Sequence, residues 1–252
     1  MTRSIDDLTE RDIAKTIDHS LLRPELDDPF IEDGCRLAAE YHVASVCVRP
    51  ADVSRARAIL DGTDVAVGTV IGFPHGNHRT ETKVFEARQA LADGATELDM
   101  VIQIGALKSG RDADVQADIA AIVEVAHAAG AIVKVIFENA YLTDDEKIRA
   151  CRLAEAAGAD FVKTSTGFAP GGATHADLRL MRANTSPHIG VKAAGGVRTL
   201  DALLDVMALG VTRIGATATK VIIDDFRARK AGGPPPGVAA PTVAGPGTEG
   251  GY

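Results

Sequence analysis

The sequence predicts a single-domain α/β protein, a TIM (β/α)8 barrel, and three observations carry that prediction. The 252 residues suffice for one such barrel. An Ala-rich stretch that ends at a glycine and leads into a β-branched run recurs around Gly94, Gly130, Gly158 and Gly210. A glycine just past a helix closes its last turn in the left-handed conformation, so each repeat indicates helix, cap and strand. No Gly-x-Gly-x-x-Gly motif opens a helix after the first strands, which disfavours an open dinucleotide-binding sheet.

Eight apolar segments, most of them separated by helical stretches, are the candidate strands. Strands that alternate with helices pair in parallel through right-handed crossovers. Eight such units within about 220 residues fit a closed barrel better than an open sheet. We expect the barrel to occupy residues 1–230. The candidate strands are 16–20, 43–48, 65–71, 97–102, 132–138, 161–165, 189–193 and 212–216.

The last part of the chain, residues 231–252, has a different composition. It consists mostly of Gly, Pro and small residues. Such a segment cannot bury enough apolar surface to offset the entropy lost on ordering. We therefore expect a flexible C-terminal tail.

Charge and composition exclude several classes of protein. Acidic residues outnumber basic ones 35 to 27, for a formal net charge of −8, which argues against a nucleic-acid partner. No run of 18 or more apolar residues exists to span a membrane, and the first 25 residues lack an apolar signal region. Cys35, Cys47 and Cys151 show no Cys-x-x-Cys spacing, which fits a reducing compartment and no zinc site. We expect a cytoplasmic protein with neither nucleic-acid nor membrane partners.

Charged residues recur within strands that should be buried, and they share one face. Along each strand they alternate with aliphatic residues, whose face must pack on the helices. The charged face therefore points into the barrel, and three of its lysines are spaced by 29 residues, one βα unit. The expected interior set is Asp99, Lys134, Glu138, Lys163 and Lys192.

Two interpretations of these interior charges stay open at this point. They could be ion pairs that plug the barrel, because burying unpaired charges costs several kcal/mol each. Alternatively, two lysines on adjacent strands form a catalytic pair. A lysine attacks a carbonyl only when neutral, and its ordinary pKa is about 10.4. A second ammonium about 4 Å away contributes roughly 4 kcal/mol, or about three pK units, and a carboxylate could then shuttle protons.

Glycine-rich loops follow the sixth, seventh and eighth strands. Glycine lets backbone N–H groups approach an anion, and the next helix presents its positive end. Because TIM barrels often hold phosphate after their last strands, these loops predict a phosphorylated substrate. His19 and His75 lack metal-binding spacing, so we expect structural roles and no metal. The expected phosphate-binding residues are Gly167, Gly171, Gly172, Gly195, Gly196, Gly215 and Thr217.

Five motifs occur in order along the chain: IDHSLL at 17–22, VIGFPHG at 70–76, ELDMV at 97–101, VKTSTGF at 162–168 and VKAAGG at 191–196. Together they resemble the class I deoxyribose-phosphate aldolase family over essentially the whole chain. The resemblance implies that Lys163 forms an imine with substrate, that Lys192 lowers the pKa of Lys163 and relays protons, and that Asp99 is a proton relay. No metal or organic cofactor is implied.

The resemblance also implies a reaction, the reversible cleavage of 2-deoxy-D-ribose 5-phosphate to acetaldehyde and D-glyceraldehyde 3-phosphate. Two positions depart from some members: Phe168 stands where they have a phosphate-holding lysine, and Thr217 where they have a serine. In some members a C-terminal tyrosine dips into the active site. Whether Tyr252 does so here, or the tail has no role, stays open. Further expected pocket-lining residues are Asp18, Cys47, Lys134 and Thr164.

Rival functions remain to be distinguished. One is another imine-forming barrel lyase or transferase that acts on a different sugar phosphate. A second is a non-catalytic barrel that binds a sugar phosphate, although neither a lysine nor the aspartate is missing. A third is a metal-dependent aldolase. A homodimer is also left open, because barrel interfaces have no local sequence signature.

Overall fold

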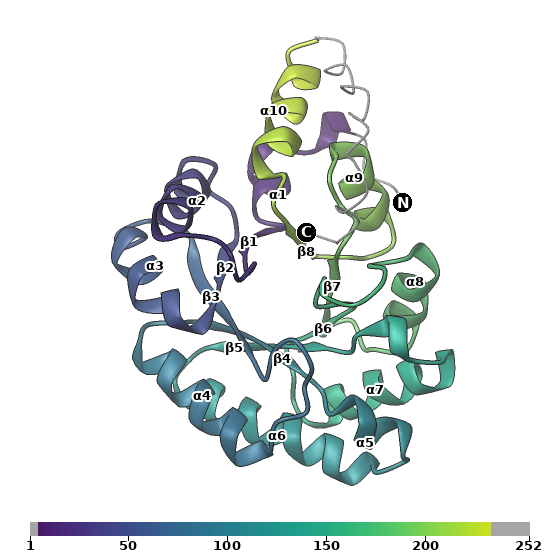
Figure 1. The fold of residues 1–252 in the computed structure, drawn as a ribbon. Coiled ribbons are helices and arrows are strands. Elements are labelled where there is room, and N and C mark those ends of the chain that lie inside the picture. Colours follow the sequence, from purple (N-terminus) through teal and green to yellow (C-terminus); the bar gives the residue numbers. More distant parts are fainter. Residues whose placement is uncertain (1–4, 233–252) are drawn as a thin grey trace.

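A computed structural model describes residues 5–232 as a closed barrel of parallel strands inside a ring of helices (Figure 1). The strands follow one another around the barrel in chain order, and the last pairs with the first. This confirms the predicted TIM barrel. The strands are β1 (Ile17–Leu21), β2 (Ser45–Val48), β3 (Ala66–Ile71), β4 (Glu97–Val101), β5 (Ile132–Ile136), β6 (Phe161–Lys163), β7 (Gly190–Ala194) and β8 (Arg213–Ala216).

The helices of the described chain surround this barrel (Figure 1). Most of them lie between consecutive strands, as right-handed βαβ crossovers require. They are α1 (Glu10–Ala14), α2 (Asp28–Glu40), α3 (Val53–Ile59), α4 (Thr80–Ala92), α5 (Ile104–Lys108), α6 (Asp112–Ala128), α7 (Asp144–Ala156), α8 (His175–Ala183), α9 (Leu200–Ala208) and α10 (Thr219–Lys230).

The glycines that mark the repeat close the helices as predicted. Gly94, Gly130, Gly158 and Gly210 have φ values of 103°, 74°, 83° and 88°. These are left-handed conformations that a side chain would strain. Each therefore ends one helix and lets the chain turn into the next strand.

The apolar core lies between the barrel wall and the helices. On β5, Val133 and Val135 are fully buried, and they belong to the same apolar cluster as Ile119 and Ile122 of α6. The aliphatic face of the strands therefore points outward, as their alternation predicts. The charged face is left to fill the barrel interior.

The first and last described helices lie side by side and close the outer ring (Figure 1). Arg227 of α10 forms an ion pair with Glu10 of α1 at 2.6 Å. Lys230 donates a hydrogen bond to the backbone oxygen of Asp6 at 2.9 Å. The expected flexible tail, 231–252, and Tyr252 lie outside the described residues apart from the turn that ends at Gly232.

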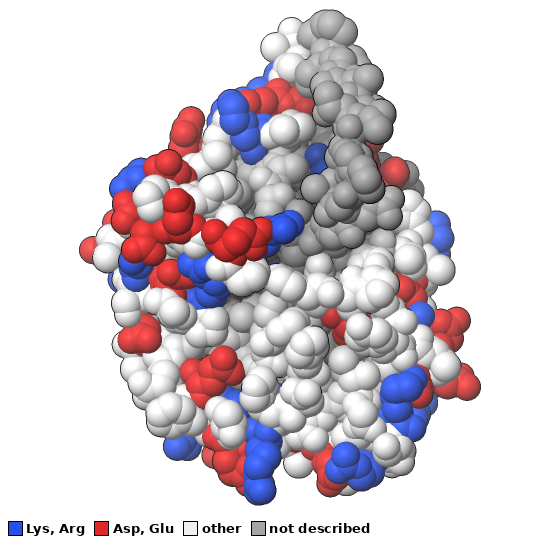
Figure 2. Space-filling view, in the orientation of Figure 1, with Lys and Arg blue, Asp and Glu red and all other residues white. Residues whose placement is uncertain are grey.

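Acidic and basic side chains are intermixed over the surface that Figure 2 presents. The face in view has no continuous basic patch of the kind that binds a nucleic-acid backbone. Within residues 5–232, no helix is both long and apolar enough to cross a membrane.

Candidate active site

The barrel interior contains a cluster of lysines gathered around Asp99 of β4. The Oδ2 atom of Asp99 accepts hydrogen bonds from Nζ of Lys163 at 2.8 Å and from Nζ of Lys192 at 2.7 Å. The Oδ1 atom accepts from Nζ of Lys134 at 2.9 Å. All four side chains are at most 1% exposed. The structure thus joins the three predicted catalytic residues through a single carboxylate.

The strand register explains why these side chains meet. Lys163 on β6 lies directly across from Lys192 on β7, and Asp99 on β4 lies across from Lys134 on β5. Neighbouring residues on paired strands point to the same side of the sheet, here into the barrel. Since Lys163 and Lys192 contact the same oxygen at 2.8 and 2.7 Å, their Nζ atoms lie within 5.5 Å of each other.

Asp18 of β1 is a full member of this cluster. Its Oδ2 atom lies 2.6 Å from Nζ of Lys192 and 3.6 Å from Nζ of Lys134. Its Oδ1 atom accepts a hydrogen bond from Arg213. Asp18 therefore does more than line the pocket, because it neutralises the second lysine that Asp99 contacts.

Arg213 and Glu97 form the base of the cluster, and sequence reasoning did not select either as a site residue. Glu97 binds Nζ of Lys134 at 2.6 Å and Nη2 of Arg213 at 2.9 Å. The Arg213 guanidinium also lies 5.8 Å from the ring centroid of Phe161. Arg213 is the first residue of β8 and shares a face with Gly215, so the same alternation that located the lysines would have located it.

This cluster carries one more cation than anions when all its groups are ionised. The cations are Lys134, Lys163, Lys192 and Arg213, and the anions are Asp18, Glu97 and Asp99.

Both central carboxylates stay ionised in this setting. Burial by itself would raise the pKa of Asp99, but the charges of Lys134, Lys163 and Lys192 together hold that pKa well below its ordinary value. Burial likewise opposes ionisation of Asp18. The positive charges of Lys192, Lys134 and Arg213, in that order of effect, nevertheless hold the pKa of Asp18 below its ordinary value. Asp18 and Asp99 are therefore both anions at neutral pH.

Cys47 lies in a small apolar cluster separate from the main core. This cluster contains Leu22, Cys47 and Val70, with Phe73 packed against it. Burial, reinforced by the charge of Asp99, raises the pKa of the Cys47 thiol to about 11. The side chain is a neutral thiol next to the charged interior rather than a thiolate nucleophile.

The loops after β6 and β7 approach each other through glycines. A Cβ atom on Gly172 would lie 2.6 Å from the backbone oxygen of Gly195, so neither loop has room for a side chain there. Gly195 and Gly196 have φ values of 80° and 98°, in the left-handed region. The Thr164 hydroxyl binds the backbone of Ala194, donating to its oxygen at 3.3 Å and accepting from its nitrogen at 3.1 Å. These contacts tie the end of β6 to the end of β7.

The remaining predicted phosphate residues have the following positions. Gly167 and Gly171 both have a φ of 87°, which suits the tight turns after β6. Gly215 lies on β8, where an added Cβ would come 3.7 Å from Cε of Lys192. Thr217 is exposed in the loop that leads into α10. The three loops therefore lie at the ends of adjacent strands.

A cavity of about 220 Å³ is lined by residues that follow β3, β4, β5 and β6, the last of which carries Lys163. It brings together groups from four loops or helices. The residues that line it are Pro74, His75, Ile104, Glu138, Tyr141, Thr166, Phe168 and Ala169.

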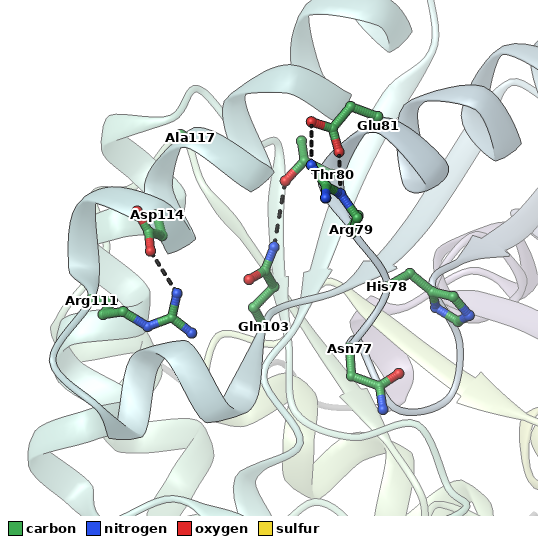
Figure 3. A pocket seen from close by; sticks show the side chains of 9 residues that line it. All are labelled: Asn77, His78, Arg79, Thr80, Glu81, Gln103, Arg111, Asp114 and Ala117. Atoms are coloured by element: carbon green, nitrogen blue, oxygen red, sulfur yellow. Dashed lines mark hydrogen bonds and ion pairs between the residues drawn. The ribbon is translucent and has the colours of Figure 1, made fainter.

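A larger polar pocket of about 430 Å³ lies further out, between the start of α4 and the start of α6 (Figure 3). Its charged side chains pair with one another: Arg79 with Glu81 at 3.1 Å, and Arg111 with Asp114 at 2.7 Å. These pairs are solvent-exposed, so they contribute little stability. None of the residues predicted for the site lines this pocket.

The two histidines singled out in the sequence differ in position. His19 is buried on β1, where its Nδ1 atom lies 2.9 Å from the Thr219 hydroxyl at the start of α10. His75 lies at the edge of the smaller cavity. Among residues 5–232, no three His, Cys, Asp or Glu side chains are arranged to hold a metal ion.

Fold and interior together define a class of protein, a TIM barrel whose interior lysines surround a carboxylate. A family model described as "DeoC/LacD family aldolase" matches residues 13–226. The chain therefore belongs to the DeoC/LacD family of aldolases, which are lyases.

Individual relatives agree with this membership. The chain is 51% identical over 215 residues to a deoxyribose-phosphate aldolase of Lysinibacillus sphaericus, covering 85% of this chain and 96% of that protein. It is 53% identical over 218 residues to one of Thermococcus gammatolerans, covering 86% and 97%. A solved tetrameric deoxyribose phosphate aldolase from Aeropyrum pernix superposes with a TM-score of 0.81 at 30% identity, covering 88% of this chain and 93% of that one.

Proposed function

We propose that this aldolase reversibly cleaves 2-deoxy-D-ribose 5-phosphate to acetaldehyde and D-glyceraldehyde 3-phosphate through an imine on Lys163. The observation that carries the proposal is the contact of two lysine amines with one oxygen of Asp99, in a cluster with one excess cation. The names of the relatives support the choice of substrate.

Charge balance favours Lys163 as the nucleophile. Among the described residues, Lys163 lies within 4.0 Å of one carboxylate, Lys192 of two and Lys134 of three. Loss of a proton from Lys163 therefore disrupts the fewest ion pairs. It also leaves three cations facing three anions, which a buried cluster prefers.

The reaction follows from a neutral amine in this position. The Lys163 amine adds to the C1 aldehyde of the open-chain sugar, and the carbinolamine loses water to give a protonated imine. A base removes the C3 hydroxyl proton, the C2–C3 bond breaks, and its electron pair enters the imine to form an enamine. D-Glyceraldehyde 3-phosphate leaves, C2 of the enamine is protonated, and hydrolysis releases acetaldehyde and free Lys163.

The neighbouring groups move the protons that these steps require. The Lys192 ammonium can donate a proton and recover it, and Asp99 with a water molecule connects it to the reacting atoms. The protonated imine is itself the electron sink, so the reaction requires no metal or organic cofactor. The glycine loops after β6, β7 and β8 are proposed to bind the phosphate through backbone N–H groups.

Reductive trapping tests the imine directly. The protein is incubated with acetaldehyde and borohydride in the presence of EDTA, which removes any metal-dependent route, and its peptides are mapped. We expect an ethyl group on Lys163 and no label on Lys83, an equally buried lysine outside the barrel interior that serves as the internal control. In Lys163→Ala, both labelling and turnover should be lost.

The other outcomes are equally informative. Label on Lys192 or Lys134 would keep the imine chemistry and reassign the nucleophile. Specific label on no interior lysine would mean that the cluster is an ion-pair plug. Comparison of deoxyribose 5-phosphate with ketose phosphates as substrates then separates this aldolase from other imine-forming barrels. Whether the protein forms a homodimer remains a prediction, and the Aeropyrum pernix relative is tetrameric.

A further inference from the structure

Glu138, the interior acid to which the proposed reaction gives no role, adopts an unusual backbone conformation. It follows β5 with φ 58° and ψ 66°, in the left-handed region that a residue with a Cβ seldom occupies. Its side chain is 2% exposed. A strained conformation and a buried carboxyl persist only where surrounding contacts hold them, and both occur most often at functional sites.

The carboxylate of Glu138 is bound to the loop after β6. Its Oε1 and Oε2 atoms lie 3.3 and 3.2 Å from the backbone nitrogen of Thr166, which donates to them. Oε2 also accepts a hydrogen bond from the Thr166 hydroxyl. That hydroxyl in turn accepts from the backbone nitrogen of Phe168 at 3.0 Å. Glu138 and Thr166 thus hold the backbone on both sides of Gly167.

The loop fixed in this way connects the reacting lysine to the expected phosphate site. Lys163 is the last residue of β6, three positions before Thr166. Gly167 has a φ of 87° and, as a glycine, wide backbone freedom. The direction of its peptide groups is therefore set by the hydrogen bonds of Thr166 and Phe168 on either side. The backbone just after β6 is also fixed, because the backbone nitrogen of Asn139 donates to the Thr164 oxygen at 2.9 Å. Loop orientation therefore depends on a residue from the neighbouring βα unit.

We propose that Glu138 is a positioning residue that sets the Thr166–Phe168 loop for recognition of the substrate's phosphate group. This inference rests on the proposed function. Glu138 acts through Thr166 and takes no part in imine formation. Its effect is specific for phosphorylated substrates, because the loop that it fixes contains Gly167, which is expected to bind the phosphate through its backbone N–H group.

The test compares two substrates that share their reacting carbons, 2-deoxyribose 5-phosphate and 2-deoxyribose. Glu138→Leu keeps approximately the size of the side chain and removes both oxygens that accept hydrogen bonds from Thr166. We expect kcat/KM for the phosphorylated sugar to fall about tenfold or more through KM, with a change below about twofold for deoxyribose. Imine trapping with acetaldehyde, which has no phosphate, should proceed at the rate of the unmodified protein.

Two further variants keep the inference falsifiable. Thr166→Val removes only the hydroxyl that links Glu138 to Phe168, and it should show the same substrate-dependent loss even if Glu138→Leu folds poorly. Glu124→Leu, which removes an exposed carboxylate on α6, is the matched control.

Three results would overturn the inference. In a folded Glu138→Leu protein, equal loss on both sugars would place Glu138 in the chemistry. An unchanged KM for the phosphorylated sugar would show that the loop does not need Glu138. A lower KM would mean that the carboxylate merely repels phosphate. If the unmodified protein cleaves deoxyribose phosphate and forms the imine, any of these defeats this inference alone; if it does neither, the proposed function fails.

Discussion

Lys163 and Lys192 share one carboxylate oxygen, so the charge of each lysine depends on the other. Their Nζ atoms lie within 5.5 Å, as the contacts of 2.8 and 2.7 Å to Asp99 require. At about 5 Å and an effective dielectric constant of 20, two ammonium groups repel by roughly 3 kcal/mol. That repulsion favours a neutral amine on one of the two lysines. A neutral amine is what nucleophilic attack requires, whereas an ion-pair plug would keep both lysines charged.

Removal of the Lys192 charge tests this coupling. In Lys192→Leu the cluster has three cations and three anions while Lys163 is still charged, so Lys163 retains its proton. We expect imine trapping at pH 7 to slow by about tenfold or more and to recover partly at pH 9. Lys192→Arg retains the positive charge and should stay nearer the original rate. Identical pH profiles for Lys192→Leu and the unmodified protein would contradict the coupling.

At the scale of elements, the site depends on how closely neighbouring loops can approach. The loops after β6 and β7 touch at Gly172 and Gly195, where Ala173 donates to the Ala194 and Gly195 oxygens at 3.0 and 3.1 Å. A side chain on either glycine would separate the loops. The glycines are therefore needed for this approach as well as for turn conformation.

Gly172→Ala should push these loops apart. Its Cβ would lie 2.6 Å from the Gly195 oxygen, a backbone atom that cannot rotate away. We expect a loss of stability of about 1–3 kcal/mol and a higher KM for the phosphorylated sugar. The matched control is Gly105→Ala in α5, where the added methyl meets nothing within 4 Å and should stabilise the protein by up to about 1 kcal/mol. Equal melting temperatures for the two variants would refute the steric argument.

The elements were largely predictable from sequence, but their ends were not. Every strand overlaps its predicted segment and extends at most one residue beyond it, because alternation and the glycine caps are local signals. The fifth strand ends at Ile136 rather than 138, since Glu138 turns into the left-handed region, and the sixth ends at Lys163 rather than 165. No glycine or proline marks the turn at Glu138 in the sequence, and Gly167 comes four residues after the end of β6.

The interior lysines were predictable because buried charges on strands are rare. A buried charge on a helix is harder to recognise. Lys83 of α4 is fully buried against Asp118 of α6 at 2.6 Å, and it also donates to the Val101 oxygen at 2.8 Å. Charged residues on helices usually face solvent, so only the packing of α4 against α6 reveals this pair.

For the whole molecule, the His19–Thr219 contact joins the first strand to the last helix and makes stability depend on pH. Burial lowers the pKa of His19 from 6.5 to about 4. A group whose pKa is lower in the folded state contributes full stability above its unfolded pKa and loses it as pH falls. The window is therefore pH 6.5 down to about 4, and the loss is about 3 kcal/mol.

His19→Asn tests this dependence. The amide can keep the hydrogen bond to the Thr219 hydroxyl but does not titrate. Denaturant unfolding measured from pH 7 to pH 4 should show a steeper loss of stability for the unmodified protein than for the variant. The contribution of all other titrating groups is common to both proteins and cancels in the difference between the two curves. Parallel curves would therefore mean that burial does not lower the pKa of His19.

The contact between α1 and α10 has a consequence for the connectivity of the fold. Eight units arranged in a ring have no geometric first member, and the Arg227–Glu10 ion pair brings the start of the ring next to its end. The same barrel is thus compatible with circular permutation, in which the start of α1 is joined to the end of α10 and the chain is opened elsewhere. The turn at 129–131, between α6 and β5, is one such place. It lies at the opposite end of the barrel from the catalytic loops, so new termini there would leave the reacting groups in place.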